Sequence, residues 1–248
     1  MKIVILAGVI GKLLYLLTKV KNKHLLPVGK ELRIFNPILQ LLSSGITDIL
    51  VVTGKGHMGE IVRLLGSGSD FDCNFTFRVQ ENAEGITDAH TVADVFSSGG
   101  RIVVILGDNI LIHSIRKYVD AFKKQPTSAK VLLKRVGDPE RFGVAAFDER
   151  NKMIMQIEEK PEPQKSDYAG IGVYMHDSFV FDVIQNITPS ECSEFETTSV
   201  NNWYVEHAEI TYDVIWGEWS DAGTFELLMQ ANTRLFPINN TIQKVEDE

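Results

Sequence analysis

The chain has 248 residues, of which 44% are hydrophobic and 23% are charged, a composition typical of a globular protein with a sizeable core. Its 25 basic and 33 acidic residues give a formal charge of −8, which disfavours nucleic acid and anionic membranes as partners. No apolar run approaches the roughly 18 residues of a membrane span, and no signal-peptide pattern opens the chain, so we expect a cytoplasmic protein. Cys73 and Cys192 lack metal-ligand spacing, and we expect both to be reduced.

Short β-branched runs alternate with helical patterns through the first half of the chain. Apolar residues at helical spacing predict helices over residues 35–42, before Gly45, and over 61–65, before Gly66. The alternation predicts an α/β fold with a mostly parallel sheet and helices on both faces, and the all-apolar runs suit strands buried on both sides. The predicted strands are residues 3–6, 49–53, 75–79, 102–106 and 130–136.

After Gly143 the pattern changes to strands joined by turns, and helical spacing returns near the end. We expect strands over residues 144–147, 153–157 and 171–174, which extend the first ones into a mixed sheet, and helices over 179–187 and 225–235. Since no linker or repeat interrupts the chain, we predict one domain over residues 1–240, with halves at 1–110 and 111–240, and a solvent-facing tail at 241–248.

The stretch "LAGVIGKLL", residues 6–14, leads from the first strand into a helix. Such a junction offers backbone N–H groups and a positive helix dipole to an anion. However, only two residues separate Gly8 from Gly11, and Leu13 follows Lys12, so this is no Walker loop. Helical spacing also predicts a core-facing stripe of Ile10, Leu13, Leu14 and Leu17. From the residues alone, the loop either cradles phosphate or packs, and their types favour packing.

Two acidic residues follow predicted strand or turn positions. Asp108 in "LGDN" comes directly after the strand 102–106, where open α/β sheets bind ligands, and its carboxylate suits Mg²⁺. It could instead cap a helix beginning near Ser114 or close a turn. Asp221 in "WSDAGT" has a similar choice, because it or Thr224 could simply cap the helix that follows.

The stretch "EEKP", residues 158–161, ends another predicted strand. Lys160 could pair with a phosphate while Glu159 accepts hydrogen bonds from hydroxyl groups, but a surface charge cluster is the commoner meaning. The six histidines show no ligand spacing and predict no zinc site. We expect His24 and His90 to make local packing or polar contacts.

The order of these motifs resembles that of the sugar-1-phosphate nucleotidyltransferases, and among them the short bacterial glucose-1-phosphate thymidylyltransferases. The likeness extends from residue 1 to about 235 and implies a Rossmann-like, mostly parallel mixed central sheet flanked by helices, of the nucleotide-diphospho-sugar transferase type. The matching stretches are "LAG" at 6–8, "NKHLLPVGK" at 22–30, "GITDILVVTGKGHMG" at 45–59, "LLGSGSDF" at 64–71, "FRVQ" at 77–80, "VVILGDN" at 103–109, "DPERFGVA" at 138–145, "IEEKPEPQKSDYA" at 157–169 and "DAGT" at 221–224.

The resemblance implies a reaction in which a sugar 1-phosphate, here glucose 1-phosphate, attacks dTTP, giving a dTDP-sugar and pyrophosphate. It further implies Mg²⁺ as cofactor and a homo-oligomeric state. By matching motif, the nucleotide would be bordered by Leu6, Ala7, Gly8 and Gly11, contacted at phosphate by Lys23, and read at the base by Gln80 and Gly85. The metal would be held by Asp108 and Asp221, and the sugar phosphate by Gly143, Glu159 and Lys160. The catalytic set would be Lys23, Asp108, Lys160 and Asp221.

The N-terminal loop departs from the family pattern G-G-x-G-T-R-L, since Val9 replaces a glycine, Lys12 the threonine and Leu13 the arginine that clamps the triphosphate. Losing one such contact costs about 3–4 kcal/mol in the transition state, so we expect reduced activity. The alternative is a catalytically silent paralogue that binds sugar nucleotides or partners an active homologue; a nicotinamide-dependent enzyme is disfavoured by the absent glycine fingerprint. Other departures are Leu32-Arg33 for Pro-Met, Asp88 for glutamine, Gly170-Ile171 for Val-Thr, Cys192 for arginine and "SEFETTS" at 193–199 for G-E-L-E-I-T-D.

Overall fold

Burial on both faces of one strand explains the long apolar run at the N-terminus. In strand β1 (Lys2–Ala7), Ile3, Ile5 and Ala7 belong to one buried cluster, whereas Val4 and Leu6 belong to another. The first cluster includes residues of helices α2 (Phe35–Leu42), α3 (Met58–Leu65) and α5 (Arg116–Lys124). The second includes residues of α6 (Val180–Asn186) and α7 (Thr197–Glu206). Helices therefore cover both faces of β1, as the sequence predicts for a doubly covered strand.

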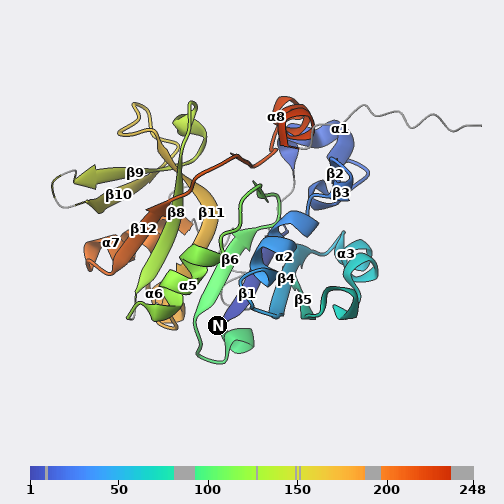
Figure 1. Cartoon of the computed structure of the whole chain (residues 1–248), viewed down its shortest axis with the longest axis horizontal. Coiled ribbons are helices and arrows are strands. Elements are labelled where there is room, and N and C mark those ends of the chain that lie inside the picture. Colours follow the sequence, from blue (N-terminus) through green and yellow to red (C-terminus); the bar gives the residue numbers. More distant parts are fainter. Residues whose placement is uncertain are drawn as a thin grey trace, which may run out of the picture.

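The computed structural model describes residues 1–8, 11–80, 93–126, 128–148, 150, 152–187 and 197–235. Its main sheet has nine strands, seven of them in the order β10-β9-β11-β6-β1-β4-β5, with β8 pairing β11 and β12 pairing β8 (Figure 1). The remaining main-sheet strands are β4 (Asp48–Gly54), β5 (Asn74–Gln80), β6 (Ile102–Leu106), β8 (Ala129–Arg135), β9 (Gly143–Asp148), β10 (Met153–Glu159), β11 (Tyr168–His176) and β12 (Ile210–Val214).

One part of the sheet is entirely parallel, and the other is mixed, with β12 parallel to β8 and the remaining pairs antiparallel. Strands β6, β1, β4 and β5 run parallel, whereas β11 pairs antiparallel with β6, β8 and β9. The β6–β11 pairing thus joins the parallel strands to the later ones and confirms the predicted mixed sheet. The division at residue 110 and the tail at 241–248 stay predictions, and residues 236–248 lie outside the described ranges.

Two short sheets and a third apolar cluster lie outside the main sheet. The short sheets pair β2 (Pro27–Val28) with β3 (Glu31–Leu32), and β7 (Ile110–Leu111) with β13 (Trp219–Ser220). Leu14 and Leu228 belong to the same buried cluster, so α8 (Phe225–Gln230) lies beside α1 (Tyr15–Thr18), as Figure 1 shows. No helix within the described ranges combines the length and apolar character needed to cross a membrane.

The structure confirms the predicted strands and corrects three helical expectations. Leu13 does not face the core: its side chain is 69% exposed, because residues 12–14 form a 3₁₀ turn that directs only Leu14 inward. The helix expected near Ser114 begins at Arg116, and it is the Ser114 hydroxyl, not Asp108, that accepts a hydrogen bond from the Arg116 N–H. The helix expected over 225–235 is α8 followed by a π-helical turn, Ala231–Leu235.

Candidate functional site

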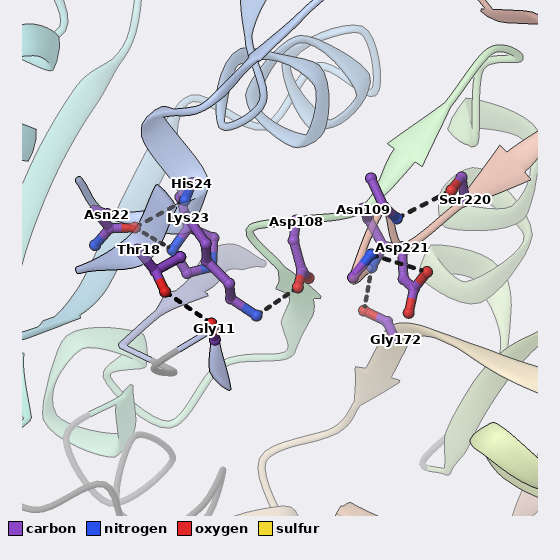
Figure 2. A network of polar contacts seen from close by, with 12 residues as sticks. Gly11, Thr18, Asn22, Lys23, His24, Asp108, Asn109, Gly172, Ser220 and Asp221 are labelled. Carbon is purple, nitrogen blue, oxygen red and sulfur yellow. Dashed lines mark hydrogen bonds and ion pairs between the residues drawn. The ribbon is translucent and has the colours of Figure 1, made fainter. Parts of the chain in front are cut away.

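A nearly buried ion pair lies at the carboxyl end of β6. Lys23 begins a 3₁₀ turn, and its Nζ lies 2.5 Å from Oδ2 of Asp108, two residues beyond the strand (Figure 2). The side chains are only 12% and 11% exposed. Burial, the largest single effect, opposes ionisation of Asp108. The charge and hydrogen bond of Lys23, together with the charges of His24 and Arg33, outweigh it and hold the pKa of that carboxyl at about 2. Asp108 is therefore a carboxylate at neutral pH.

The turn that carries Lys23 is fixed by Asn22 and His24. The Asn22 side-chain oxygen accepts a hydrogen bond from the His24 backbone N–H at 2.8 Å and lies 2.7 Å from His24 Nδ1. His24 is buried, and burial followed by the Lys23 charge lowers the pKa of its imidazole. His24 thus makes the local polar contact expected from the sequence, whereas His90 lies outside the described residues.

Asp221 lies directly after β13, on the other side of the pair. Its Oδ2 accepts a hydrogen bond from Arg141 Nη2 at 3.2 Å, and its Oδ1 accepts one from the Gly223 N–H at 3.3 Å. Burial raises the pKa of Asp221, and the charge of Asp108 contributes in the same direction. The two carboxylates predicted to share a metal are therefore within electrostatic reach of each other, although no hydrogen bond joins them.

Asn109 ties three segments together between these acids. Its Nδ2 donates to the carbonyl of Gly172 at 3.2 Å, and its Oδ1 accepts from Trp219 Nε1 at 2.5 Å. These bonds connect the end of β6 to β11 and β13, and Figure 2 shows Asn109 next to Asp221. Sequence reasoning noticed Asn109 only as part of its motif, because its partners are more than 60 residues away.

The residues expected to hold the sugar phosphate meet at the paired ends of β9 and β10. Gly143 is opposite Glu159 in the strand register, and a Cβ on Gly143 would lie 3.1 Å from Glu159 Oε2. That oxygen accepts a hydrogen bond from the Thr198 hydroxyl at 2.9 Å, an interaction the sequence did not predict. Lys160 follows with a side chain 67% exposed and Nζ 3.8 Å from Glu159 Oε1. Its ammonium is thus exposed beside the Glu159 carboxylate, where a ligand can reach both.

The residues expected around the nucleotide collect at the ends of β1 and β5. A Cβ on Gly8 would lie 2.6 Å from Gln80 Oε1, so the Gln80 side chain reaches the backbone at the end of β1. A Cβ on Gly11 would lie 3.2 Å from Cβ of Lys23, which places the loop against the ion pair. Leu6 and Ala7 are buried at the end of β1. Gly85, like Val9 and Asp88, lies outside the described residues.

Two arginines join the site without having been predicted. Arg141 pairs with Asp221, and the charges of Asp108 and Asp221 both act on Arg33. Arg141 belongs to the motif "DPERFGVA", so its position in that stretch was the available signal. Arg33 offered a signal only as a departure from the family pattern. Both depend on contacts between segments distant in sequence.

The donor set at Asp108 and Asp221 suits a hard divalent cation. Mg²⁺ commonly takes one or two carboxylates from a protein and completes its octahedron with water and substrate phosphates. Within the described part of the chain, no group of three or more His, Cys, Asp or Glu side chains comes together as a protein-only metal site. The two carboxylates therefore suit a metal ion whose remaining ligands come from substrate phosphates and water, and not one bound by protein ligands alone.

Residues 2–237 match the family model described as nucleotidyl transferase. A glucose-1-phosphate thymidylyltransferase of Neisseria gonorrhoeae is 37% identical over 243 residues, covering 97% of this chain and 84% of the relative. A Bacillus anthracis crystal structure, described as a proposed glucose-1-phosphate thymidylyltransferase in complex with a sucrose, is 49% identical to this chain, with a TM-score of 0.91. The match covers 97% of this chain and 96% of that one. A UDP-glucose pyrophosphorylase complexed with UDP-glucose has a TM-score of 0.83 at 20% identity, covering 95% and 98%, and shows the shared fold alone.

Proposed function

Since this chain belongs to the nucleotidyl transferase family, we propose that it joins glucose 1-phosphate to dTTP, releasing pyrophosphate and a dTDP-sugar. The observation that carries this proposal is the ion pair of Lys23 and Asp108, with Asp221 in electrostatic reach, between two groups of predicted binding residues. One group lies at the ends of β1 and β5, the other at the ends of β9 and β10. Ligand sites of open α/β sheets lie at such strand ends.

The nucleotide would bind along the first group. Leu6, Ala7, Gly8 and Gly11 would border it, and Gln80, with Gly85, would read the pyrimidine. Lys23 would donate to a phosphate oxygen, because its ammonium is held at the end of β6 by Asp108. The close approach of Gly8 to Gln80 supports a shared role for the ends of β1 and β5.

The sugar phosphate would bind along the second group. Glu159 would accept hydrogen bonds from hexose hydroxyls, Lys160 would pair with the phosphate, and Gly143 would leave the space between them open. An oxygen of the sugar 1-phosphate would then attack the α-phosphorus of dTTP in line. The new P–O bond would form as the bond from the α-phosphorus to the oxygen that bridges to the β-phosphate breaks, and pyrophosphate would leave with that electron pair. Positioning and charge neutralisation carry such a reaction. Mg²⁺, when bound by Asp108 and Asp221, would neutralise phosphate charge.

We expect the turnover to be low. Leu13 stands where the family loop carries an arginine, and its side chain is 69% exposed with no hydrogen-bond donor. A bidentate, charge-assisted contact to phosphate is therefore missing. The same observation favours the second candidate, a silent paralogue that binds sugar nucleotides or pairs with an active enzyme. A homo-oligomeric state and a cytoplasmic location stay predictions.

Pyrophosphate release from dTTP and glucose 1-phosphate with Mg²⁺, at high enzyme concentration, tests the proposal. We expect slow turnover in the wild type and none in Asp108→Asn, because the carboxylate for the metal and Lys23 is lost. Asp70→Asn is the control, since Asp70 is exposed and its carboxylate takes no part in the described hydrogen bonds and ion pairs of the site; it should keep wild-type turnover. No turnover together with measurable dTDP-glucose binding would contradict the enzyme and support the silent paralogue.

A further inference from the structure

Arg33 is a buried cation without a hydrogen-bond partner. Its side chain is among the largest that are fully buried, and the residue is 1% exposed. Among the residues that the structure describes, Nε, Nη1 and Nη2 have no partner. Water solvates a guanidinium strongly, so burying one without hydrogen bonds or a paired carboxylate destabilises the fold. Packing alone does not explain an arginine at this position.

The backbone holds Arg33 next to the candidate site. Its N–H donates to the Leu26 carbonyl at 3.0 Å, and the next N–H, of Ile34, donates to the His24 carbonyl at 3.0 Å. The segment after β3 is thereby bonded to the turn that carries Lys23. From there the guanidinium feels the charges of Asp108 and Asp221. Its positive charge therefore acts on both carboxylates in addition to the charge of Lys23.

Arg33 differs from the other described cations of this region in having no paired carboxylate. Lys23 is paired with Asp108, and Arg141 with both Asp221 and Asp138. The Arg33 guanidinium has no such partner among the described residues, and neighbouring His24 is buried and adds no negative charge. Its positive charge would attract a phosphate group and repel a divalent cation at the two site carboxylates.

We propose that Arg33 supplies fixed positive charge to the phosphate site and lowers the affinity of Asp108 and Asp221 for a divalent cation. The inference rests on the proposed function, which assigns phosphates and a metal to these carboxylates. Coulomb repulsion in a poorly solvated site is much stronger than in water, and it is doubled for a divalent ion. Because all three nitrogens are buried, Arg33 acts through its charge and not through ligand contact.

Mn²⁺ binding to the whole, nucleotide-free protein tests the proposal, measured from the electron paramagnetic resonance signal of free Mn²⁺. Mn²⁺ takes the same oxygen ligands as Mg²⁺. We expect Arg33→Met to bind Mn²⁺ at least about tenfold more tightly, since the repelling charge is gone. Arg33→Lys keeps the charge and should stay within about twofold of the wild type. Arg63→Met, an exposed change on α3, is the matched control and should also stay within twofold.

Equal Mn²⁺ affinity in the wild type and Arg33→Met would overturn the proposal. Arg33→Gln is a second neutral variant and should show the same gain. If both neutral variants fail to fold, the proposal is also overturned, because Arg33 would then be required for structure. The two proposals fail separately: turnover with no gain in Arg33→Met contradicts only the role of Arg33, whereas a gain without any pyrophosphate release contradicts only the enzyme.

Discussion

Leu13 and Leu14 are adjacent but have opposite roles. Leu14 is fully buried in the cluster that also contains Leu26 and Leu228, so it fixes the N-terminal turn to the C-terminal helix. Leu13 leaves the same turn toward solvent, and Leu16 of the following helix α1 is also exposed, at 78%. The turn therefore keeps an apolar anchor at Leu14 and exposes an apolar side chain at Leu13, where the family pattern given above has an arginine.

Restoring a donor at this position should raise turnover. We expect Leu13→Arg to increase kcat/KM for dTTP at least about tenfold, because removing one comparable transition-state donor costs about 10²–10³ in rate. The change should not affect stability, since the side chain is exposed. Pyrophosphate release measured over a range of dTTP concentrations checks it.

The control is Leu16→Arg, which adds the same charge to an exposed position of α1. It should leave kcat/KM within about twofold, because an exposed charge that makes no direct contact with the phosphates is screened by water and salt. If both variants, or neither, raise turnover, general electrostatic attraction or another step governs the rate, and the missing clamp does not.

At the scale of elements, hydrophobic patterning predicted most strands but missed α7 and β12. The predicted strand 102–106 is β6 to the residue, and residues 3–6 and 49–53 lie within β1 and β4. Such runs have no alternative but burial on two faces. By contrast, α7 buries Thr197 and Asn201, so its buried face includes polar side chains and its apolar spacing is weak.

Local sequence pattern also predicted only part of the candidate site. Asp108 was predicted because a position directly after a parallel strand has meaning in the sequence. The pairing of Arg141 with Asp221 joins residues 80 apart, and the hydrogen bond of Thr198 to Glu159 joins residues 39 apart. Contacts of this kind depend on how elements pack and not on local pattern. Chemistry tied to a strand end was therefore predictable, and its partners were not.

The junction of β11 and α7 contains a buried histidine with a testable effect on stability. His176, the last residue of β11, lies 3.3 Å through Nε2 from Asn201 Oδ1, and its ring centroid is 5.7 Å from that of Tyr204. The Tyr204 hydroxyl donates to Asp177 Oδ1 at 2.9 Å. Burial lowers the pKa of His176 to about 4, although the hydrogen bond with Asn201 opposes this. The folded protein therefore holds a neutral imidazole.

This pKa makes folding stability depend on pH below neutrality. The unfolded chain takes up the proton near its ordinary value of about 6.5, so stability is fully present above that pH and is lost as the pH falls toward 4. Between pH 7.5 and pH 5 we expect His176 to account for a loss of about 2 kcal/mol in the free energy of unfolding. Urea unfolding at both pH values measures it.

The pH effect should disappear in one variant and persist in another. His176→Gln has no titrating ring and should lack this part of the loss, whatever its absolute stability. His207→Gln, at an exposed position just after α7, should retain the wild-type loss. If His176→Gln loses as much stability as the wild type over this range, acidic groups elsewhere cause the effect.

At the scale of the whole molecule, the residues of the candidate site come from strands at opposite edges of the sheet. Gln80 ends β5 at one edge of the parallel side, and Glu159 ends β10 at the opposite edge of the sheet (Figure 1). Asp108 lies after β6, between them in the strand order. A dTDP-sugar has a base at one end and a hexose at the other. A bound product would therefore contact both β5 and β10, which do not pair with each other in the sheet.

Such a ligand should stabilise the fold as a unit, whether or not the protein is an active enzyme. At a dTDP-glucose concentration of about 100 times Kd, binding adds about 2.7 kcal/mol to the free energy of unfolding, or roughly 5–10 °C in Tm for a chain of this size. We expect Gln80→Ala and Glu159→Ala each to remove most of this shift, because each loses one end of the ligand. Asp70→Asn, at an exposed position, should keep it. A shift that survives Glu159→Ala but not Gln80→Ala would mean that only the nucleotide is recognised, which would remove the sugar from the proposed function while leaving the nucleotide site in place.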